Sequence, residues 1–436
     1  MAWLREAKPR APTQAPATAH TPAPSAPTAQ PAQSNGSLAE KFRQLEAKLN
    51  QRFVGREREI HAAVLALASG EPMYWEAPPG TAKTTIIETL ASLIDARYFY
   101  YAMHEYVEPD EVLGPVDIVA LRERGEFKRV TTGYLPEAEI VFIDEVYRAS
   151  GAMLNLLIDV ILNKRVKIGA RTLKLPTVAM YFAANFRRAE EEFAAFHDRL
   201  TIRVFSGYLN DRQQLKELIQ RGLELLRAKV LPNSSDVVMT VDEVRKFQQV
   251  AAVKAANIVA NVIDKIAELV QHARSANIPV SDRRAVKLAY VAAVIALLDG
   301  RNSADGDDVA EAARLVLPLE PADLDRVEQI VTAMGLDTLR ELRQKLSQLI
   351  DESKRLASMI LEAYAKQLRG EEIPEEISDV IEAFRRTTSE LERTLAKAKA
   401  SAKTAKLVQQ YLPRLREAIE LMRKAEPIAR ELASRM

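Results

Sequence analysis

The stretch EAPPGTAKTT, residues 76–85, brings together a glycine, a lysine and threonines at a spacing suited to binding a polyphosphate. It resembles the phosphate-loop pattern GxxxxGK[ST], with Ala77 and Ala82 where the pattern has glycine. Such a loop points backbone N–H groups at phosphate oxygens, at the positive end of a helix dipole. Gly80 is the residue expected to need unusual backbone angles. Alanine is acceptable at the other two positions if φ is negative there.

The side chains of this loop predict a magnesium–nucleotide site. Lys83 would neutralise charge on the β- and γ-phosphates, and Thr84 would bind Mg²⁺. The residues expected to contact the nucleotide are Pro79, Gly80, Thr81, Ala82, Lys83, Thr84 and Thr85. The loop alone does not exclude an accident of composition.

A second chemical element is IVFIDEVYRAS, residues 140–150, in which an apolar run ends on two carboxylates. Asp144 would hold Mg²⁺, and Glu145 would polarise the attacking water. The alternative is a strand end followed by a solvated acidic pair. The preceding phosphate loop disfavours that alternative.

A third element, TVAMYFAAN, also ends an apolar run on a polar residue, Asn185. Its amide could position the water beside Glu145. A turn-forming asparagine would give the same pattern, so Asn185 gains its meaning from the elements around it.

Two arginine pairs follow. FHDRLTIRV carries Arg199 and Arg203, and an arginine there could stabilise transition-state charge in a neighbouring subunit's site. VSDRRAVK carries Arg283 and Arg284 at the start of a predicted helix, where one of them would face back towards the nucleotide. Structural salt bridges are the usual role of such arginines, so neither pair is specific by itself.

The elements that must position these residues alternate between strands and helices from Phe53 to about Gly207. EPMYWEA, ARYFYYA, AEIVFID and TVAMYFAAN read as buried strands, which predicts a mainly parallel sheet between helices. Residues 208–318 are helical by period. Beyond Pro318, apolar residues at a 3–4 spacing predict a coiled-coil-type helical hairpin or three-helix appendage. Residues 1–36 are rich in proline and alanine and predict a disordered tail.

The amino-acid composition excludes several classes of protein to which the chain could belong. The 436 residues contain 61 Lys and Arg against 60 Asp and Glu, so no whole-chain basic field is available to attract nucleic acid. The absence of cysteine excludes disulfides and thiolate metal sites, and the five histidines have no metal-binding spacing. The longest apolar run is too short to cross a bilayer, and MAWLREAKPR does not resemble a signal peptide, so a cytoplasmic location is expected.

In their order along the chain, these elements resemble AAA+ ATPases of the MoxR family, and within that family the RavA-like branch. The segments that carry the resemblance are FVGRERE, APPGTAKT, GYLPEAEIVFIDEV, LNLLIDVILNKRVKIGA, AFHDRLTIRV and VSDRRAVK, within about residues 45–318. The resemblance implies an α/β AAA+ core with an all-α lid. The expected domains are a tail (1–36), the nucleotide-binding domain (37–207), the lid (208–318) and a helical interaction module (319–436).

The resemblance also assigns roles to matching residues. Lys83 and Thr84 fall in Walker A, Asp144 and Glu145 in Walker B, Asn185 at sensor 1, Arg199 at the finger acting in trans, and Arg283 at the sensor 2 arginine of the lid. Arg203 and Arg284 remain alternatives for the last two. Ala82 is common in the family, whereas Ala77 departs from its pattern.

The implied activity is Mg²⁺-dependent ATP hydrolysis by a homo-oligomer, a hexameric ring, that remodels a protein client. A partner with a von Willebrand factor A domain is implied as well. Hairpins at ALRERGEFKRV, turning at Gly125, and KRVKIGARTLKL, turning at Gly169, would face the pore or the client, although ordinary solvated hairpins would have the same pattern. A nucleic-acid motor of helicase type and a scaffold that senses nucleotide without hydrolysis are the alternatives.

Overall fold

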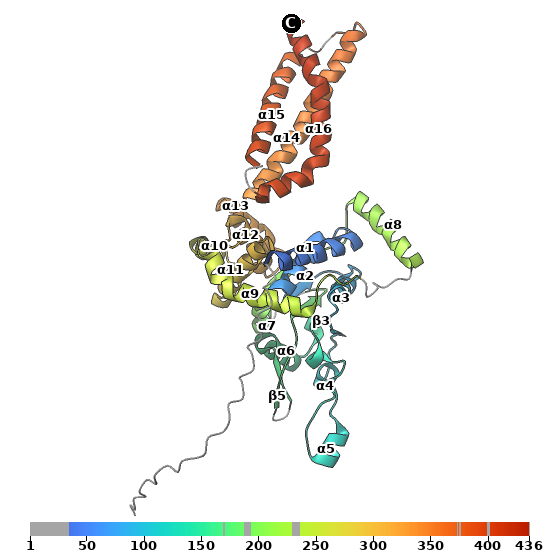
Figure 1. The fold of residues 1–436 in the computed structure, drawn as a ribbon, viewed down its shortest axis with the longest axis vertical. Coiled ribbons are helices and arrows are strands. Elements are labelled where there is room, and N and C mark those ends of the chain that lie inside the picture. Colours follow the sequence, from blue (N-terminus) through green and yellow to red (C-terminus); the bar gives the residue numbers. More distant parts are fainter. Residues whose placement is uncertain are drawn as a thin grey trace, which may run out of the picture. The chain divides into compact units, whose positions relative to one another are not determined.

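The computed structural model describes residues 35–168, 171–186, 193–228, 236–372, 374, 376–398 and 402–435. Figure 1 shows its elements in chain order. The α-helices are α1 (Asn35–Arg52), α2 (Glu57–Ser69), α3 (Lys83–Leu93), α4 (Pro109–Leu113), α5 (Ile118–Arg124), α6 (Gly151–Asn163), α7 (Ala194–Arg199), α8 (Arg212–Ala228), α9 (Val241–Val259), α10 (Ile263–Ser275), α11 (Asp282–Leu298), α12 (Gly306–Val316), α13 (Asp323–Ala333), α14 (Thr338–Leu368), α15 (Ile377–Ala398) and α16 (Ala402–Arg435). Two 3₁₀ helices, η1 (Leu135–Glu137) and η2 (Val146–Arg148), flank the third strand.

A five-stranded parallel sheet, in the order β2-β3-β6-β1-β7, organises the first half of the chain. Its strands are β1 (Met73–Glu76), β2 (Tyr98–Ala102), β3 (Ile140–Asp144), β6 (Ala179–Ala184) and β7 (Ile202–Phe205). Because the strands are parallel, their carboxyl ends share one edge. The loop after β1, the carboxylates after β3 and Asn185 after β6 therefore meet at that edge.

Both faces of the sheet are covered, as the near-continuous apolar strands require. Ile140 and Phe142 of β3 belong to an apolar core that includes α2, α3 and the helices from α9 to α12. Val141 and Ile143, which alternate with them, belong to a second core that includes α6 and α7. The predicted α/β core with a helical domain packed on it is confirmed.

The structure differs from the sequence reading at two strands. β2 is an edge strand whose Tyr100 and Ala102 are exposed, not a fully buried one. β7 was not assigned, because Arg203 interrupts its apolar run, yet that arginine is only 1% exposed.

The two expected hairpins have different structures. The first contains the helix α5, with the Asp117 carboxylate accepting a hydrogen bond from the Ala120 N–H and Gly125 ending it at φ 63°. A single bridge between Val116 and Arg129 closes this segment. The second is an antiparallel pair, β4 (Arg165–Ile168) and β5 (Arg171–Lys174), and its turn at Gly169 lies outside the described residues.

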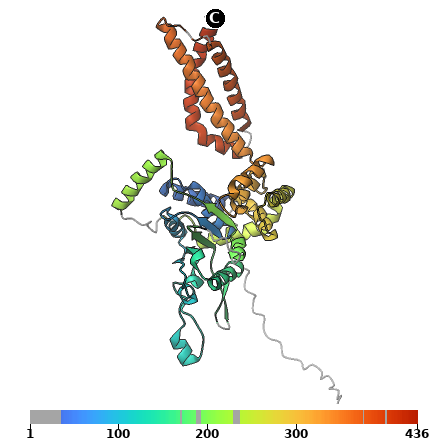
Figure 2. The same cartoon turned by 180° about the vertical axis from the view of Figure 1, so that it is seen from behind.

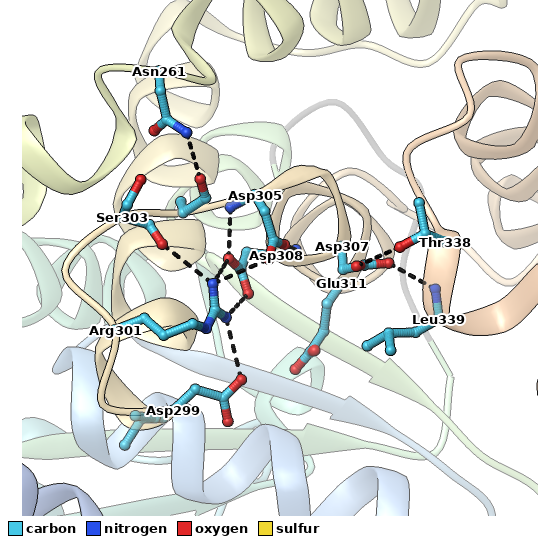
Figure 3. Close-up of polar contacts among 12 residues, drawn as sticks. Asn261, Asp299, Arg301, Ser303, Asp305, Asp307, Asp308, Glu311, Thr338 and Leu339 are labelled. Carbon is cyan, nitrogen blue, oxygen red and sulfur yellow. Dashed lines mark hydrogen bonds and ion pairs between the residues drawn. The ribbon is translucent and has the colours of Figure 1, made fainter. Parts of the chain in front are cut away.

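A charged cluster fixes the turn between α11 and α12 (Figure 3). The Arg301 guanidinium lies among the carboxylates of Asp299, Asp305 and Asp308, and its two Nη atoms donate to Asp308 at 2.8 and 2.5 Å. Asp308 has no solvent exposure, so the arginine compensates a charge that would otherwise be costly to bury. The neighbouring Asp307 accepts hydrogen bonds from the Thr338 hydroxyl and the Leu339 N–H at the start of α14.

The last three helices, α14, α15 and α16, pack along one another (Figures 1 and 2). Their shared core contains Leu346, Ile360, Phe384 and Leu415. Ser353, which interrupts the apolar spacing of α14, is fully buried and satisfies its hydroxyl by donating to the Leu349 carbonyl at 2.6 Å. None of the helices in the described part of the chain is long and apolar enough to span a membrane.

Candidate functional site

The loop between β1 and α3 has the geometry of a phosphate cradle. Gly80 has φ 79°, a conformation that residues with a side chain rarely adopt. A Cβ built there would meet no atom within 4 Å, so glycine is needed for the backbone conformation and not for lack of space. Among the described residues, no side chain caps the N-terminus of α3. The first N–H groups of a helix need a partner, and an anion is a natural one.

Ala82 does not have the negative φ that would make alanine acceptable at its position. Its φ is 65°, in the left-handed region, whereas Ala77 is not among the described residues with positive φ and is 1% exposed. A non-glycine residue in that region costs roughly 1–2 kcal/mol. The alanine before the lysine is therefore strained, and the alanine that departs from the family pattern is not.

Replacing Ala82 with glycine is expected to stabilise the protein without nucleotide. Relief of the strain outweighs the greater freedom of glycine in the unfolded chain, with a net gain of about 0.5–1 kcal/mol. The matched control is Ala77→Gly, which relieves no strain, adds unfolded-state freedom and removes a buried methyl group, and should destabilise the protein by about 1–2 kcal/mol. Thermal unfolding of the three proteins checks both signs, and a lower unfolding temperature for Ala82→Gly would contradict the strain.

Lys83 is buried inside the loop and forms two hydrogen bonds there. Its Nζ donates to the Ala77 carbonyl at 2.7 Å and to the Asn185 Oδ1 at 3.0 Å, and the residue is 7% exposed. Burial lowers the pKa of Lys83, while the charges of Asp144 and Glu145 act in the opposite direction. The lysine thus lies between the loop and the two carboxylates.

Glu145 forms the other end of this network. The Asn185 Nδ2 donates to the Glu145 Oε1, so one amide links the lysine and the carboxylate. Glu145 has φ 50°, and its N–H donates to the Asp144 Oδ1 at 2.9 Å. A strained backbone at such a position commonly marks a functional residue. The structure brings together Lys83, Glu145 and Asn185, which the sequence predicted to act together.

The remaining donors suit a magnesium ion bound jointly with phosphates. Thr84 is the second residue of α3 and Asp144 ends β3, so a hydroxyl and a carboxylate approach the same edge of the sheet. Among the described residues, no group of three or more His, Cys, Asp or Glu side chains could hold a metal unaided. Mg²⁺ is usually held by one or two carboxylates together with substrate phosphates and water, and these oxygen donors fit that arrangement.

Arg199 and Arg283 lie away from the loop. β7 is parallel to β1, with Ile202 opposite Met73, so Arg199, three residues before β7 begins, lies towards the amino ends of the strands, whereas the residues after Glu76 lie at their carboxyl ends. Arg283 joins Arg199 there, because its Nη1 is 2.9 Å from the Asp198 Oδ2. Among the described residues Arg199 forms no ion pair, and its Nη1 donates to the Ala195 carbonyl.

The two alternative arginines are buried and bound to backbone. Arg203 donates to the Pro318 carbonyl at 3.1 Å and to the His197 carbonyl. Arg284 is 2% exposed and donates to the Val316 carbonyl at 2.7 Å. These contacts join α7 and β7 to the end of α12 and suit a structural role.

Sequence reasoning missed one charged neighbour of the site. The Arg148 Nε lies 3.4 Å from the Glu145 Oε2, on the 3₁₀ helix that follows β3. Its spacing of three residues from Glu145 was the available signal, since residues three apart on a helical turn are neighbours.

Comparisons with known proteins agree with this geometry. Residues 40–249 match the model described as the MoxR domain in the MoxR-vWA-beta-propeller ternary systems, and residues 259–331 match an AAA lid domain. An uncharacterized protein of Methanocaldococcus jannaschii is 30% identical over 322 residues, which are 73% of this chain and 82% of that protein. Chaperone MoxR1 of Mycobacterium tuberculosis is 22% identical over 204 residues, 46% of this chain and 51% of the chaperone.

A solved structure gives the same fold. The crystal structure of a Cytophaga hutchinsonii protein assigned as an ATPase has a TM-score of 0.54 and 19% identity, and the match covers 70% of this chain and 96% of that one. The phosphate loop, the paired carboxylates after β3 and the two domain matches lead to one conclusion. The chain belongs to the MoxR family of AAA+ ATPases.

Proposed function

We propose that this protein hydrolyses ATP with Mg²⁺ and uses the energy to remodel a protein client as a homo-oligomeric ring. The observation that carries the proposal is the Lys83–Asn185–Glu145 network beside Thr84 and Asp144. Its side chains supply a cation for the phosphates, an acceptor for a proton of water, and an amide that orients both. This is the set that phosphoryl transfer to water requires.

Each residue has a defined task in this proposal. Lys83 leaves the Ala77 carbonyl and neutralises the β- and γ-phosphate charge of bound ATP. Glu145 accepts a proton from the attacking water, and Asn185 keeps that carboxylate in place. Thr84 and Asp144 would hold Mg²⁺, which supplies further charge neutralisation on the phosphates.

Arg199 and Arg283 would act on the nucleotide of a neighbouring subunit. Their position towards the amino ends of the strands, away from their own loop and side by side at Asp198, supports a role in trans for both. This differs from the expectation that the lid arginine turns back to its own nucleotide. The family resemblance supports a hexamer as the assembly in which one subunit's arginines reach the next subunit's loop.

The client side of the proposal rests on the relatives. The matching domain model describes MoxR domains that occur with vWA and beta-propeller proteins, which supports a von Willebrand factor A domain partner. Chaperone MoxR1 supports action on proteins. The RavA-like branch and the cytoplasmic location stay predictions.

A phosphate-release assay tests the proposed activity. The full chain with ATP and Mg²⁺ is expected to release phosphate, and release should stop in excess EDTA. Stimulation by an added vWA-domain protein, with none by DNA or RNA, is the expected pattern because the chain has no excess of basic residues. Stimulation by nucleic acid alone would favour the motor of helicase type, and an absence of release would favour the scaffold.

A further inference from the structure

A row of side chains with polar ends runs from the start of the phosphate loop to α7. Tyr74 of β1 has no solvent exposure, and its hydroxyl donates to the Glu76 Oε2 at 3.0 Å. Its ring meets the Tyr147 ring nearly edge-on, with the centroids 5.6 Å apart. The Tyr147 hydroxyl in turn lies 2.8 Å from the His197 Nδ1, within hydrogen-bond distance. Both tyrosines belong to the second core, on the face of the sheet away from α3.

Tyr147 connects the carboxyl end of β3 with α7. It lies on η2, two residues after Glu145, and is 3% exposed. Its ring also meets the rings of Phe193 and Phe196 edge-on, with centroids 5.8 and 6.1 Å away. These contacts hold the ring, and the hydroxyl adds a directional bond to a buried nitrogen. The bond specifies one arrangement of η2 and α7, because sliding one past the other would break it inside the core.

His197 is fixed through its backbone as well as through its ring. The residue is 6% exposed, and its carbonyl accepts hydrogen bonds from Arg203 and, at 3.2 Å, from Arg284. Arg199 follows two residues later and ends the six-residue helix α7. The orientation of so short a helix sets the direction in which the Arg199 side chain leaves it. Tyr147 holds this helix from the side of η2.

We propose that Tyr147 is a positioning residue for the arginine that acts in trans, and that its hydrogen bond to His197 fixes α7 for that task. The inference rests on the proposed ATP hydrolysis, with Arg199 acting on a neighbouring subunit's nucleotide. Because Tyr147 is buried, it acts through α7 and not on the nucleotide. An arginine that stabilises a transferring phosphoryl group must be placed accurately, since a misplacement of about 1 Å can lower the rate about 10²-fold.

The test is the conservative change Tyr147→Phe, which keeps the ring on its aromatic neighbours and removes only the hydroxyl. Phosphate release by the full chain at saturating ATP is expected to fall about 10- to 100-fold, because α7 loses its directional bond. Binding of a fluorescent ATP analogue should stay within about twofold of the unmodified protein, since an interaction made only in the transition state does not contribute to nucleotide affinity. Phosphate release at the unmodified rate would overturn the inference.

The matched control is Tyr181→Phe, a buried tyrosine on the other face of the same sheet. Its hydroxyl donates to the Ala63 carbonyl at 2.9 Å, in the core that contains α2 and α3. Each variant loses one buried hydrogen bond, so both should lower the unfolding temperature. Phosphate release should fall in Tyr147→Phe and not in Tyr181→Phe. An equal loss in the two variants would assign the effect to lowered stability and overturn the inference.

Subunit mixing shows which side of the interface Tyr147 serves. Tyr147→Phe is mixed with Glu145→Gln, which supplies intact arginines, and separately with Arg199→Ala, which supplies an intact loop and carboxylates. Once the subunits have exchanged, a 10-fold defect confined to the arginine side should make the first mixture release phosphate about five times as fast as the second.

The other outcomes of the mixing experiment contradict the inference or the proposed function. Equal rates in the two mixtures would overturn the inference, because the defect would then belong to neither side. The reverse order would overturn it as well, because Tyr147 would then serve Glu145 of its own subunit. An unmodified protein that releases no phosphate would instead reject the proposed function, and the inference with it.

Discussion

Replacing Glu145 with glutamine is expected to give a protein that binds ATP and slows its hydrolysis by about 10²–10⁴-fold, the contribution of a positioned general base. Glutamine preserves the size of the side chain and can still pair with Asn185, whose amide contacts the Glu145 Oε1. It cannot accept the proton of the attacking water. Phosphate release and equilibrium binding of ATP, measured on the same preparation, separate the two effects.

A suitable control for this change is Glu105→Gln. Glu105 is an exposed carboxylate in the loop after β2 and has no place in the Lys83–Asn185–Glu145 network. The control should hydrolyse ATP at the unmodified rate. Hydrolysis by Glu145→Gln at that same rate would show that the water is activated by another group.

Replacing Arg199 with alanine is expected to reduce hydrolysis by about 10³–10⁵-fold, the range found for arginines that stabilise a transferring phosphoryl group. The binding of ATP should change little, because Arg199 lies towards the amino ends of the strands, away from its own loop. Steady-state phosphate release and nucleotide affinity are again the measurements.

Arg203→Ala distinguishes a finger from a structural arginine. Arg203 is 1% exposed and bonds the carbonyls of His197 and Pro318, so its loss leaves buried acceptors unsatisfied and should lower stability by about 1–3 kcal/mol or more. Arg199→Ala should keep the unmodified unfolding temperature. If Arg199→Ala retained full activity, its assignment as the finger would be wrong.

The part of the site that the sequence predicted depends on short-range geometry. A strand, a loop and a helix follow one another around Gly80 and Lys83, and parallel strands place Asp144 and Asn185 at the same sheet edge whatever the rest of the chain does. The residue types at those strand ends therefore sufficed to foresee the network that links Lys83 to Glu145.

The rest depends on packing between distant segments. Arg283 on α11 donates to Asp198 on α7. The two residues are 85 positions apart, so no local sequence pattern predicts this contact. The backbone of Ala82 was misjudged because alanine usually avoids the left-handed region.

The claim that the site is completed by a second copy is tested most directly by mixing two inactive proteins, Glu145→Gln and Arg199→Ala. The first supplies intact arginines and the second an intact loop and carboxylates. Where the arginines of a Glu145→Gln subunit face the loop of an Arg199→Ala subunit, the interface between them has every residue of the proposed site. Once labelled subunits have been shown to exchange, the mixture is expected to release phosphate well above the sum of the separate proteins. An exchanged mixture that stays as inactive as its components would contradict the account.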